Sequence, residues 1–483
     1  MNNILSDLNP TLVFKYFEEI SQIPRGSGNE LAISNYLKTF GESLGLETIQ
    51  DDALNIIIKK PATLGYESCP GVILQGHMDM VCEKNKDTEH DFEKDPLDLV
   101  IKDDYIYANG TTLGADNGIA VAMGMAVLAS DNLDHPNIEV IITSDEEAGM
   151  SGAMNLDGSN INGKYIINLV SEEEGYLLVS CAGGVTVKSR LPLQFNNIKS
   201  SKKAFLVEIK GLLGGHSGMD IIKQRGNSNI LIGRLLNLLD VEFDLAHISG
   251  GSKNNAIPRE SEAIILIDEK DLDSFDASIK NIESIFKNEY STSDSDLSIT
   301  YSSTNVDNHF SSYTKNSIIT LLNLVPNGIQ TMSMDIDSLV QSSTNLGVVY
   351  SDNDYLTFEF AVRSSVKTLK EDITNKIRLI TNTLGGEFIL ESDYPAWEYV
   401  KNSKLEEICC NVYKDLTGKE PIIMAIHAGL ECGLLLDKIP NSEAISLGPN
   451  MYDVHTPNEH LSISSTLNTW DYLVKILASM NKY

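Results

Sequence analysis

A histidine and two aspartates lie where the chain changes from apolar to polar. His77 and Asp79 follow the apolar run 71–75, and a histidine at the end of a strand can bind a metal while a nearby carboxylate orients its ring. Asp116 lies in the polar turn 111–118, before a small apolar segment. Taken alone, Asp116 is equally typical of a helix cap, and the His-x-Asp pattern is weak. Metal-assisted chemistry is therefore a hypothesis that needs further ligands.

Three consecutive acids and a second histidine supply those ligands. Asp145, Glu146 and Glu147 follow the apolar run Ile138–Ile142, and His455 follows a late strand and a Gly-Pro turn. Acids at a buried strand end are costly unless a cation compensates them, although a solvated turn is the simpler alternative. Together the residues offer the ligand types of zinc or manganese sites. Two metals about 3.5–4 Å apart activate a water and polarise a carbonyl, so the set predicts a hydrolase in which Glu146 stays free to act as base.

The composition limits the class of protein. The chain has 483 residues, 42% of them hydrophobic and 22% charged, which is typical of a globular protein with two or three domains. Its formal net charge is −31, so nucleic acid and anionic membranes are poor partners. The longest apolar stretch, from Gly118 to Ala129, is far shorter than the ~20 residues that span a bilayer. Six irregularly spaced cysteines and an N-terminus without a signal-peptide pattern favour a cytoplasmic protein without a disulfide framework.

Two patterns of hydrophobicity alternate along the chain and predict its fold class. Buried α/β strands are predicted at 71–75, 138–142, 165–169 and 444–447, with helices at 10–20, 30–43, 118–130 and 405–416. Between them, alternating strands such as 205–209 and 356–360 mix with amphipathic helices at 229–239 and 367–384. The chain therefore predicts a discontinuous α/β domain, 1–188 and 395–483, with a mixed sheet flanked by helices. An α+β domain, 189–394, is inserted into it.

The polar segments, taken together, resemble the M20 family of metallopeptidases that use two metals. The segments that carry the resemblance are Gly76–Asp79, Leu113–Gly118, Asp145–Gly149 and the late His455. More narrowly, Ile23–Glu30, Ser171–Gly175 and Ala425–Gly433 are similar to the aminoacyl-histidine dipeptidase branch, the carnosine-cleaving type. The resemblance covers essentially the whole chain, with the segments in the family's order.

The resemblance implies a role for each residue of the first domain. His77 binds one metal, Asp116 bridges both, and Glu147 and His455 bind the other. Asp79 orients His77, and Glu146 is the general base. Two divalent ions are implied, with zinc preferred over manganese or cobalt, and the Asp116–Asn117 peptide is expected to be cis.

The resemblance also assigns residues of the inserted domain, which becomes a lid that mediates dimer contacts. His216, in a glycine-rich segment, matches a histidine that stabilises the oxyanion, often across a dimer. Asn255 and Arg363 match residues that hold the substrate carboxylate, a task suited to the planar fork of arginine. In the last part of the first domain, Glu431 and His427 are four residues apart and are predicted to share one helix face, where the carboxylate could receive the substrate's amino group.

One position departs from the family pattern. Where the family has an aspartate that binds the metal of His77, this chain has Val170. Valine has no lone pair and cannot coordinate a metal. Ser171 and Glu172 are the nearest alternatives, but adjacent residues of a strand point to opposite faces, so neither is assigned as a replacement.

The resemblance predicts a homodimeric dipeptidase that hydrolyses Xaa-His dipeptides. A broader dipeptidase, tripeptidase or deacylase of the same family is one alternative. A catalytically impaired relative that binds peptide or metal without turnover is another, favoured by Val170 and opposed by the intact Glu146.

Overall fold

The chain forms two compact units, each with its own sheet and core. The computed structural model describes residues 4–198 and 202–482. The first unit contains the residues up to Ser180, Tyr399–Ala425 and those from Leu430 on. The second contains Cys181–Glu398 and Ile426–Gly429. The predicted mixed α/β architecture is confirmed, while the lid and dimerisation roles of the inserted segment stay predictions.

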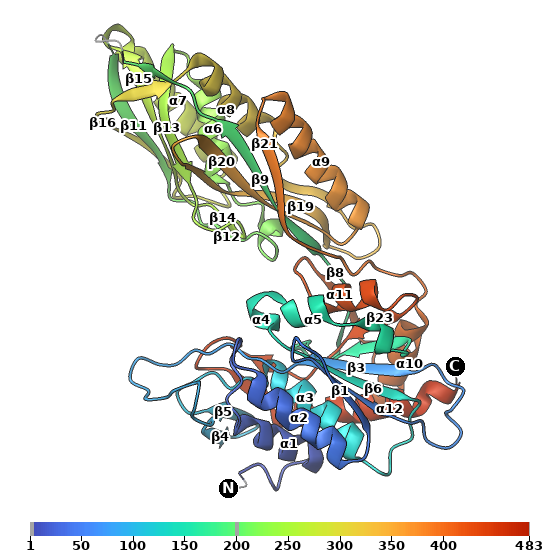
Figure 1. The fold of residues 1–483 in the computed structure, drawn as a ribbon. Coiled ribbons are helices and arrows are strands. Elements are labelled where there is room, and N and C mark those ends of the chain that lie inside the picture. Colours follow the sequence, from blue (N-terminus) through green and yellow to red (C-terminus); the bar gives the residue numbers. More distant parts are fainter. Residues whose placement is uncertain (1–3, 199–201, 483) are drawn as a thin grey trace. The chain divides into compact units, whose positions relative to one another are not determined.

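An eight-stranded mixed sheet is the centre of the first unit (Figure 1). Its order is β1 (Glu47–Gln50), β2 (Ile56–Lys60), β6 (Ile138–Thr143), β3 (Val72–His77), β7 (Tyr165–Asn168), β23 (Glu443–Ser446), β8 (Tyr176–Cys181) and β22 (Ile422–Ile426). β3 pairs in parallel with β6 and β7. Because the carboxyl ends of parallel strands meet at one edge, the residues that follow these strands are brought together.

The register places the predicted site at this edge. His77 is opposite Thr143, the last residue of β6, and Gln75 is opposite Asn168, the last residue of β7. The two glutamates 146 and 147 therefore begin their short helix just beyond the strand that neighbours His77. Position 170 follows the strand on the other side of β3.

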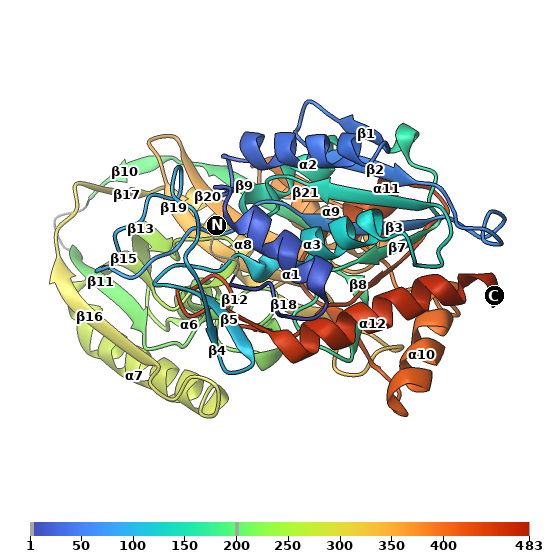
Figure 2. The same ribbon diagram turned by 90° about the horizontal axis from the view of Figure 1, so that it is seen from below.

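Helices cover both faces of this sheet. α1 (Thr11–Ser21) packs on α3 (Ala115–Ala129), and α3 packs on β3. The opposite face is covered by α11 (Glu431–Lys438), whose Leu435 lies in one core with Ile73 and Ile141. α10 (Lys404–Thr417) and α12 (Ile463–Ser479) lie side by side in both views (Figure 1 and Figure 2). The remaining helices of this unit are α2 (Leu31–Ser43), α4 (Glu146–Gly149) and α5 (Ser151–Asn155).

A small four-stranded sheet completes the first unit. Its order is β24 (Met451–Tyr452), β25 (His460–Ser462), β5 (Tyr105–Ala108) and β4 (Leu99–Lys102). The loop between β24 and β25 carries His455. Among the described residues, no helix has the length and apolar character needed to cross a bilayer.

The second unit is a large antiparallel sheet packed against helices (Figure 1). Its order is β16 (Ser298–Thr304), β11 (Lys202–Lys210), β15 (Ser261–Asp268), β13 (Phe243–Gly250), β19 (Val340–Ser351), β20 (Tyr355–Ser364), β9 (Gly183–Pro192) and β21 (Glu387–Tyr394), with β18 (Gly328–Met332) beside β19. The helices are α6 (Ser228–Leu238), α7 (Leu272–Glu289), α8 (Ser312–Leu324) and α9 (Lys367–Thr383). Two short pairs are β10 (Phe195–Asn197) with β17 (Asn308–Phe310), and β12 (Gly215–His216) with β14 (Ala256–Ile257). Alternate residues of β9, such as Val185 and Val187, enter the core.

Two local predictions differ from the structure. The helix predicted from Gly118 begins at Ala115, and Asp116 and Asn117 inside it have non-helical backbone angles. The peptide between them is cis, as the resemblance implied. The shared helix face of His427 and Glu431 is wrong, because α11 begins at Glu431 and His427 lies in the connection after β22. His427 and Glu431 also belong to different compact units.

Candidate metal centre and active site

Four ligand-type side chains converge at the edge of the first sheet. Asp116 lies between the two histidines: its Oδ1 is 3.2 Å from His77 Nε2, and its Oδ2 is 3.3 Å from His455 Nε2. Glu147 Oε1 is 3.0 Å from the same nitrogen of His455. Ligand atoms of His77, Asp116 and Glu147 lie within 4.8 Å of one another. A carboxylate that presents one oxygen to each of two histidines has the geometry of a bridging ligand.

Asp79 connects the loops that carry these ligands. The carboxylate lies 3.4 Å from His77 Nδ1, and the Asp79 carbonyl oxygen is 3.1 Å from that nitrogen. Oδ1 and Oδ2 also accept the main-chain N–H groups of Glu146 and Glu147. These N–H groups begin α4 and have no partner inside the helix. Because His77 Nδ1 donates toward Asp79, His77 Nε2 keeps its lone pair for a metal.

The charges of the cluster show why a cation suits it. Burial opposes the charged form of His77, but hydrogen bonds to Asp116 and Asp79 raise its pKa well above the ordinary value. Hydrogen bonds to Asp116 and Glu147 raise the pKa of His455 to about 10. Burial, together with nearby carboxylates that include Glu431, raises the pKa of Glu146. Without a metal, protons on these groups offset an excess of buried negative charge. Two imidazole nitrogens and the carboxylates around them therefore fit a divalent metal.

Glu146 is held close to the ligands but outside their contacts. Its Oε2 lies 4.0 Å from His77 Nε2, and its main-chain N–H is bonded to Asp79. The side chain is largely buried, so its carboxylate has few waters to stabilise the charged form. A carboxyl group with a raised proton affinity beside a ligand is suited to proton transfer.

Val170 stands at the position where the family pattern has a metal-binding aspartate. It follows β7 and is half-buried, and its N–H is bonded to Asn168 Oδ1 at 3.3 Å. The preceding carbonyl, of Leu169, accepts a hydrogen bond from the Asn117 side chain, beside the bridging Asp116. Burial and the charge of Asp116 raise the pKa of Glu172 to about 7. Glu172, which was not assigned from the sequence, therefore shares the surroundings of the ligands.

Glu431 is buried beneath the same strand ends. Its Oε2 accepts hydrogen bonds from Gln75 Nε2 at 2.6 Å and Thr143 Oγ1 at 2.8 Å. Its Oε1 has no hydrogen-bond partner among the residues that the structure describes. Burial raises the pKa of this carboxyl group. Glu431 thus retains an unused acceptor close to His77 and Asp79, both of which act on its charge.

The other predicted substrate residues form one cluster within the second unit. His216 and Ala256 are opposite each other in the β12–β14 pair, and the Asn255 carbonyl accepts the N–H of the residue after His216. Arg363 donates to the Tyr394 hydroxyl at 2.9 Å. His427 Nε2 lies 2.7 Å from Ser343 Oγ. Burial and the positive charge of Arg363 lower the pKa values of His216 and His427, the latter to about 3.

His216 is also oriented by its own loop. Its Nδ1 accepts the main-chain N–H groups of Gly218 and Met219, at 3.3 and 3.1 Å. An imidazole that accepts at Nδ1 and is kept neutral by a lowered pKa carries its proton on Nε2. The ring therefore presents a hydrogen-bond donor.

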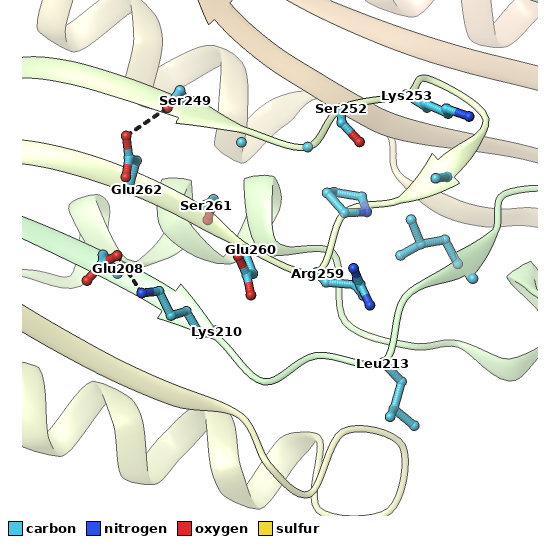
Figure 3. A pocket seen from close by; sticks show the side chains of 16 residues that line it. Glu208, Lys210, Leu213, Ser249, Ser252, Lys253, Arg259, Glu260, Ser261 and Glu262 are labelled. Atoms are coloured by element: carbon cyan, nitrogen blue, oxygen red, sulfur yellow. Dashed lines mark hydrogen bonds and ion pairs between the residues drawn. The ribbon is translucent and has the colours of Figure 1, made fainter.

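The strand pair that carries His216 also forms one wall of a cavity. The cavity has a volume of about 610 Å³ and is bounded by β11, β13, β15 and the β12–β14 pair (Figure 3). Glu208 is paired with Lys210 and Ser249 with Glu262, whereas the Arg259 side chain is drawn without a partner (Figure 3). None of the predicted site residues lines this cavity, so the volume alone does not locate the chemistry.

The sequence model of peptidase family M20/M25/M40 matches residues 73–479, which include every proposed metal ligand. The chain belongs to peptidase family M20/M25/M40. It is 36% identical over 476 residues to the cytosol non-specific dipeptidase of Escherichia coli, and the match covers 98% of each chain. This M20 chain also resembles the crystal structure of aminoacylhistidine dipeptidase from Vibrio alginolyticus, with 35% identity, a TM-score of 0.94 and 98% of each chain covered.

A more distant structure shares the fold of this chain. Aminopeptidase PepT from Bacillus cereus has 17% identity and a TM-score of 0.57, over 98% of this chain and 99% of that one. At that identity the likeness concerns the fold alone. The family predicted from the motifs is confirmed, and the structure from Vibrio alginolyticus is named for the predicted branch.

The sequence did not identify every residue that shapes the site. Arg25 was noted only as part of a motif, and Glu459 was not singled out. Both are buried beside the ligand loops. Arg25 is the only basic residue of the motif 23–30, which is the one signal that could have marked it, and nothing comparable marks Glu459.

Proposed function

We propose that this M20 peptidase is a metal-dependent dipeptidase that prefers Xaa-His dipeptides such as carnosine. The observation that carries the proposal is the bridging geometry of Asp116 between His77 and His455, with Glu146 beside it. The dipeptidase names of the relatives from Escherichia coli and Vibrio alginolyticus support the substrate class. The cytosolic name of the former supports a cytoplasmic location, and a homodimer is proposed from the family resemblance.

Two divalent ions are proposed, with zinc preferred and manganese or cobalt as alternatives. His77 and Asp116 would hold one ion, while Asp116, Glu147 and His455 would hold the other. A bound metal of this kind supplies Lewis-acid polarisation of the peptide carbonyl and lowers the pKa of a water ligand. The second set has three protein ligands, the usual complement of a catalytic zinc.

The site's own residues carry out the proton transfers. Glu146 accepts a proton from the attacking water and returns it to the leaving amine. Its raised pKa favours this exchange, because the protonated form is then accessible near neutral pH. Asp79 keeps the ring of His77 in one orientation and holds the start of α4, so Glu146 is presented at a constant position.

Residues of the second unit and Glu431 are proposed to bind the substrate. The Nε2–H of His216 is suited to stabilise the oxyanion, and Asn255 and Arg363 to bind the terminal carboxylate. The unpartnered Oε1 of Glu431 is suited to accept the substrate's amino group. His427 is proposed to assist that recognition, which its neutral ring permits.

A peptide panel tests the proposal. Purified protein is assayed on carnosine, Ala-Ala, a tripeptide and an N-acylated amino acid with added zinc, manganese or cobalt, and metal content is measured on the same sample. Fastest hydrolysis of carnosine supports the proposal. Comparable rates on Ala-Ala or the tripeptide, or cleavage of the acylated amino acid, identify a broader peptidase or a deacylase. Metal binding without turnover on any substrate identifies an impaired relative, the alternative that Val170 favours.

A further inference from the structure

Two buried charged side chains that are not ligands hold the turn that carries Asp116. Arg25 and Glu459 are each only 2% exposed. Both form hydrogen bonds with the main chain of the turn 113–116, from different parts of the sequence. Burying an ionised group is costly, and replacement by apolar residues is often neutral or stabilising. Arg25 and Glu459 are therefore expected to have a role other than stabilising the folded protein.

Arg25 connects the loop after His77 to the turn before Asp116. Its Nη1 donates to the Met78 carbonyl at 3.0 Å, and its Nη2 donates to the Gly114 carbonyl at 2.5 Å. The fork of one guanidinium thus bridges two segments that are far apart in sequence. Gly114 has φ of 64°, and a Cβ atom there would lie 2.6 Å from Arg25 Nη2. The turn is shaped around the arginine.

Glu459 connects the same turn to the loop of His455. Its Oε2 accepts the N–H groups of Leu113 and Gly114 at 2.8 and 2.9 Å, and its Oε1 accepts that of Asp116 at 3.3 Å. The N–H of Glu459 is bonded to the Thr456 carbonyl, so a tight turn separates it from His455. One carboxylate therefore joins the backbone of the bridging ligand to the loop of another ligand.

We propose that Arg25 and Glu459 are positioning residues. They hold the side chains of His77, Asp116 and His455 close enough to one another to bind metal, even in the metal-free protein. This inference rests on the proposed metal-dependent function. Without the two side chains, metal binding would have to order three loops, and the entropy of ordering would weaken binding. Mutation of residues that orient metal ligands through hydrogen bonds typically lowers the metal affinity 10- to 100-fold.

Glu139 provides a matched control for Glu459. It is 5% exposed and accepts main-chain N–H groups from Asn162 at 2.9 Å and Gly163 at 2.8 Å. It lies near the start of β6, at the opposite end of that strand from Thr143 and the ligands. Glu139→Gln and Glu459→Gln remove the same charge from similar surroundings, but only Glu459 contacts the ligand turn.

The test is a zinc titration of metal-free protein with a competing chelator, with the thermal midpoint measured for each variant. We expect Glu459→Gln to raise the zinc dissociation constant about 10- to 100-fold, and Glu139→Gln to leave it unchanged at a similar loss of stability. Equal dissociation constants for wild type and Glu459→Gln would overturn the proposal. So would an equal rise in both variants, which would reflect stability alone.

A second variant keeps the proposal testable if Glu459→Gln does not fold. Arg25→Lys retains the charge but replaces the fork by one ammonium, which cannot hold the Met78 and Gly114 carbonyls in the same way. Zinc binding weakened at least tenfold in Arg25→Lys supports the proposal, and unchanged binding overturns it. Absence of zinc binding in the wild type would instead contradict the proposed function itself.

Discussion

Glu146 is the acid of the cluster that the ligand contacts leave free. Asp116 and Glu147 are in contact with His455, whereas Glu146 is 4.0 Å from His77 Nε2 and is fixed by its main-chain bond to Asp79. We therefore assign it to proton transfer rather than metal binding.

Replacing this carboxylate separates the two roles. Glu146→Gln should lower kcat by about 10²–10⁴, the range that general base catalysis contributes, while metal content and substrate affinity stay near those of the wild type. Glu147→Gln is the matched comparison and should lose metal as well. Steady-state rates on carnosine and elemental analysis of the same samples check both. A Glu146→Gln variant with near-normal rates would remove Glu146 from the mechanism.

At position 170, a valine stands where the family pattern has an aspartate, and we propose that this weakens retention of the ion assigned to His77 and Asp116. With His77 and Asp116 as its only proposed protein ligands, that ion would keep more water ligands than the ion assigned to Asp116, Glu147 and His455. We expect one metal to survive dialysis and a second to be lost, so that activity depends on added metal.

Val170→Asp should increase both the retained metal and the turnover, since it supplies the carboxylate that the family pattern has at this position. Val170→Asn, with the same shape and no charge, should gain less. Metal content after dialysis and the rate of the dialysed protein without added zinc measure the effect. Two tightly held ions in the unmodified protein, with no gain from Val170→Asp, would show that another group such as Glu172 serves that ion.

Short elements orient the groups of the second unit. The two-residue strands β12 and β14 align His216 with Ala256, and the loop that follows holds Nδ1 through two main-chain N–H groups. The element therefore sets which nitrogen of the ring carries the proton.

His216→Ala should lower kcat by about 10²–10³, as removal of an oxyanion donor does, with a much smaller rise in KM. His247→Ala, on β13 of the same unit, should leave both values unchanged. Initial rates over a range of carnosine concentrations separate the two constants. A change in KM alone would make His216 a ground-state binder.

The connection between β22 and α11 buries a neutral histidine. His427 has a pKa of about 3 in the folded protein because of burial and the charge of Arg363, against an ordinary value of 6.5. Between these pH values the unfolded chain binds a proton that the folded protein does not. Stability from this residue is therefore complete above pH 6.5 and is lost as the pH falls.

His427→Gln should remove that pH dependence. The free energy of unfolding of the wild type, minus that of the variant, should rise by up to about 1.4 kcal/mol per pH unit from pH 4 to 6. Above pH 7 the difference should be constant. Urea unfolding at several pH values measures it, and a difference independent of pH would show that His427 titrates normally.

On the scale of the whole molecule, the proposed dimer can be tested by mixing inactive subunits. If His216 serves the site of the other subunit in a symmetric dimer, a heterodimer of His216→Ala and Glu146→Gln chains contains one intact site. Random exchange should then restore about a quarter of the wild-type activity, because half of the dimers are mixed and each has one complete site. Mass spectrometry verifies the exchange. Mixed dimers without activity would place His216 in its own chain's reaction.

The candidate site residues that directly follow a strand could be predicted from the sequence. His77 and Asp79 follow a buried strand, Glu146 and Glu147 follow the next one, and strands and helices are found close to their predicted ranges. Hydrophobic periodicity and strand-end polarity are properties of neighbouring residues, so they are readable without the fold. The departure at Val170 was visible from the resemblance to the family, which has an aspartate at this position.

Tertiary structure decided the contacts between distant segments. The parallel register of β3 with β6 and β7, the hydrogen bonds of Arg25 to two loops, and those of Glu459 to the turn of Asp116 join residues that no local pattern connects. The loop position of His427 was also not predictable, because a helix can begin at either His427 or Glu431 until packing selects the start. The buried setting of Glu431 was not predictable either, because its partners Gln75 and Thr143 are distant in the sequence. The sequence thus determined which chemical groups are available, and the packing of the sheet edge determined which of them meet, because hydrogen bonds and buried charges depend on distance in space.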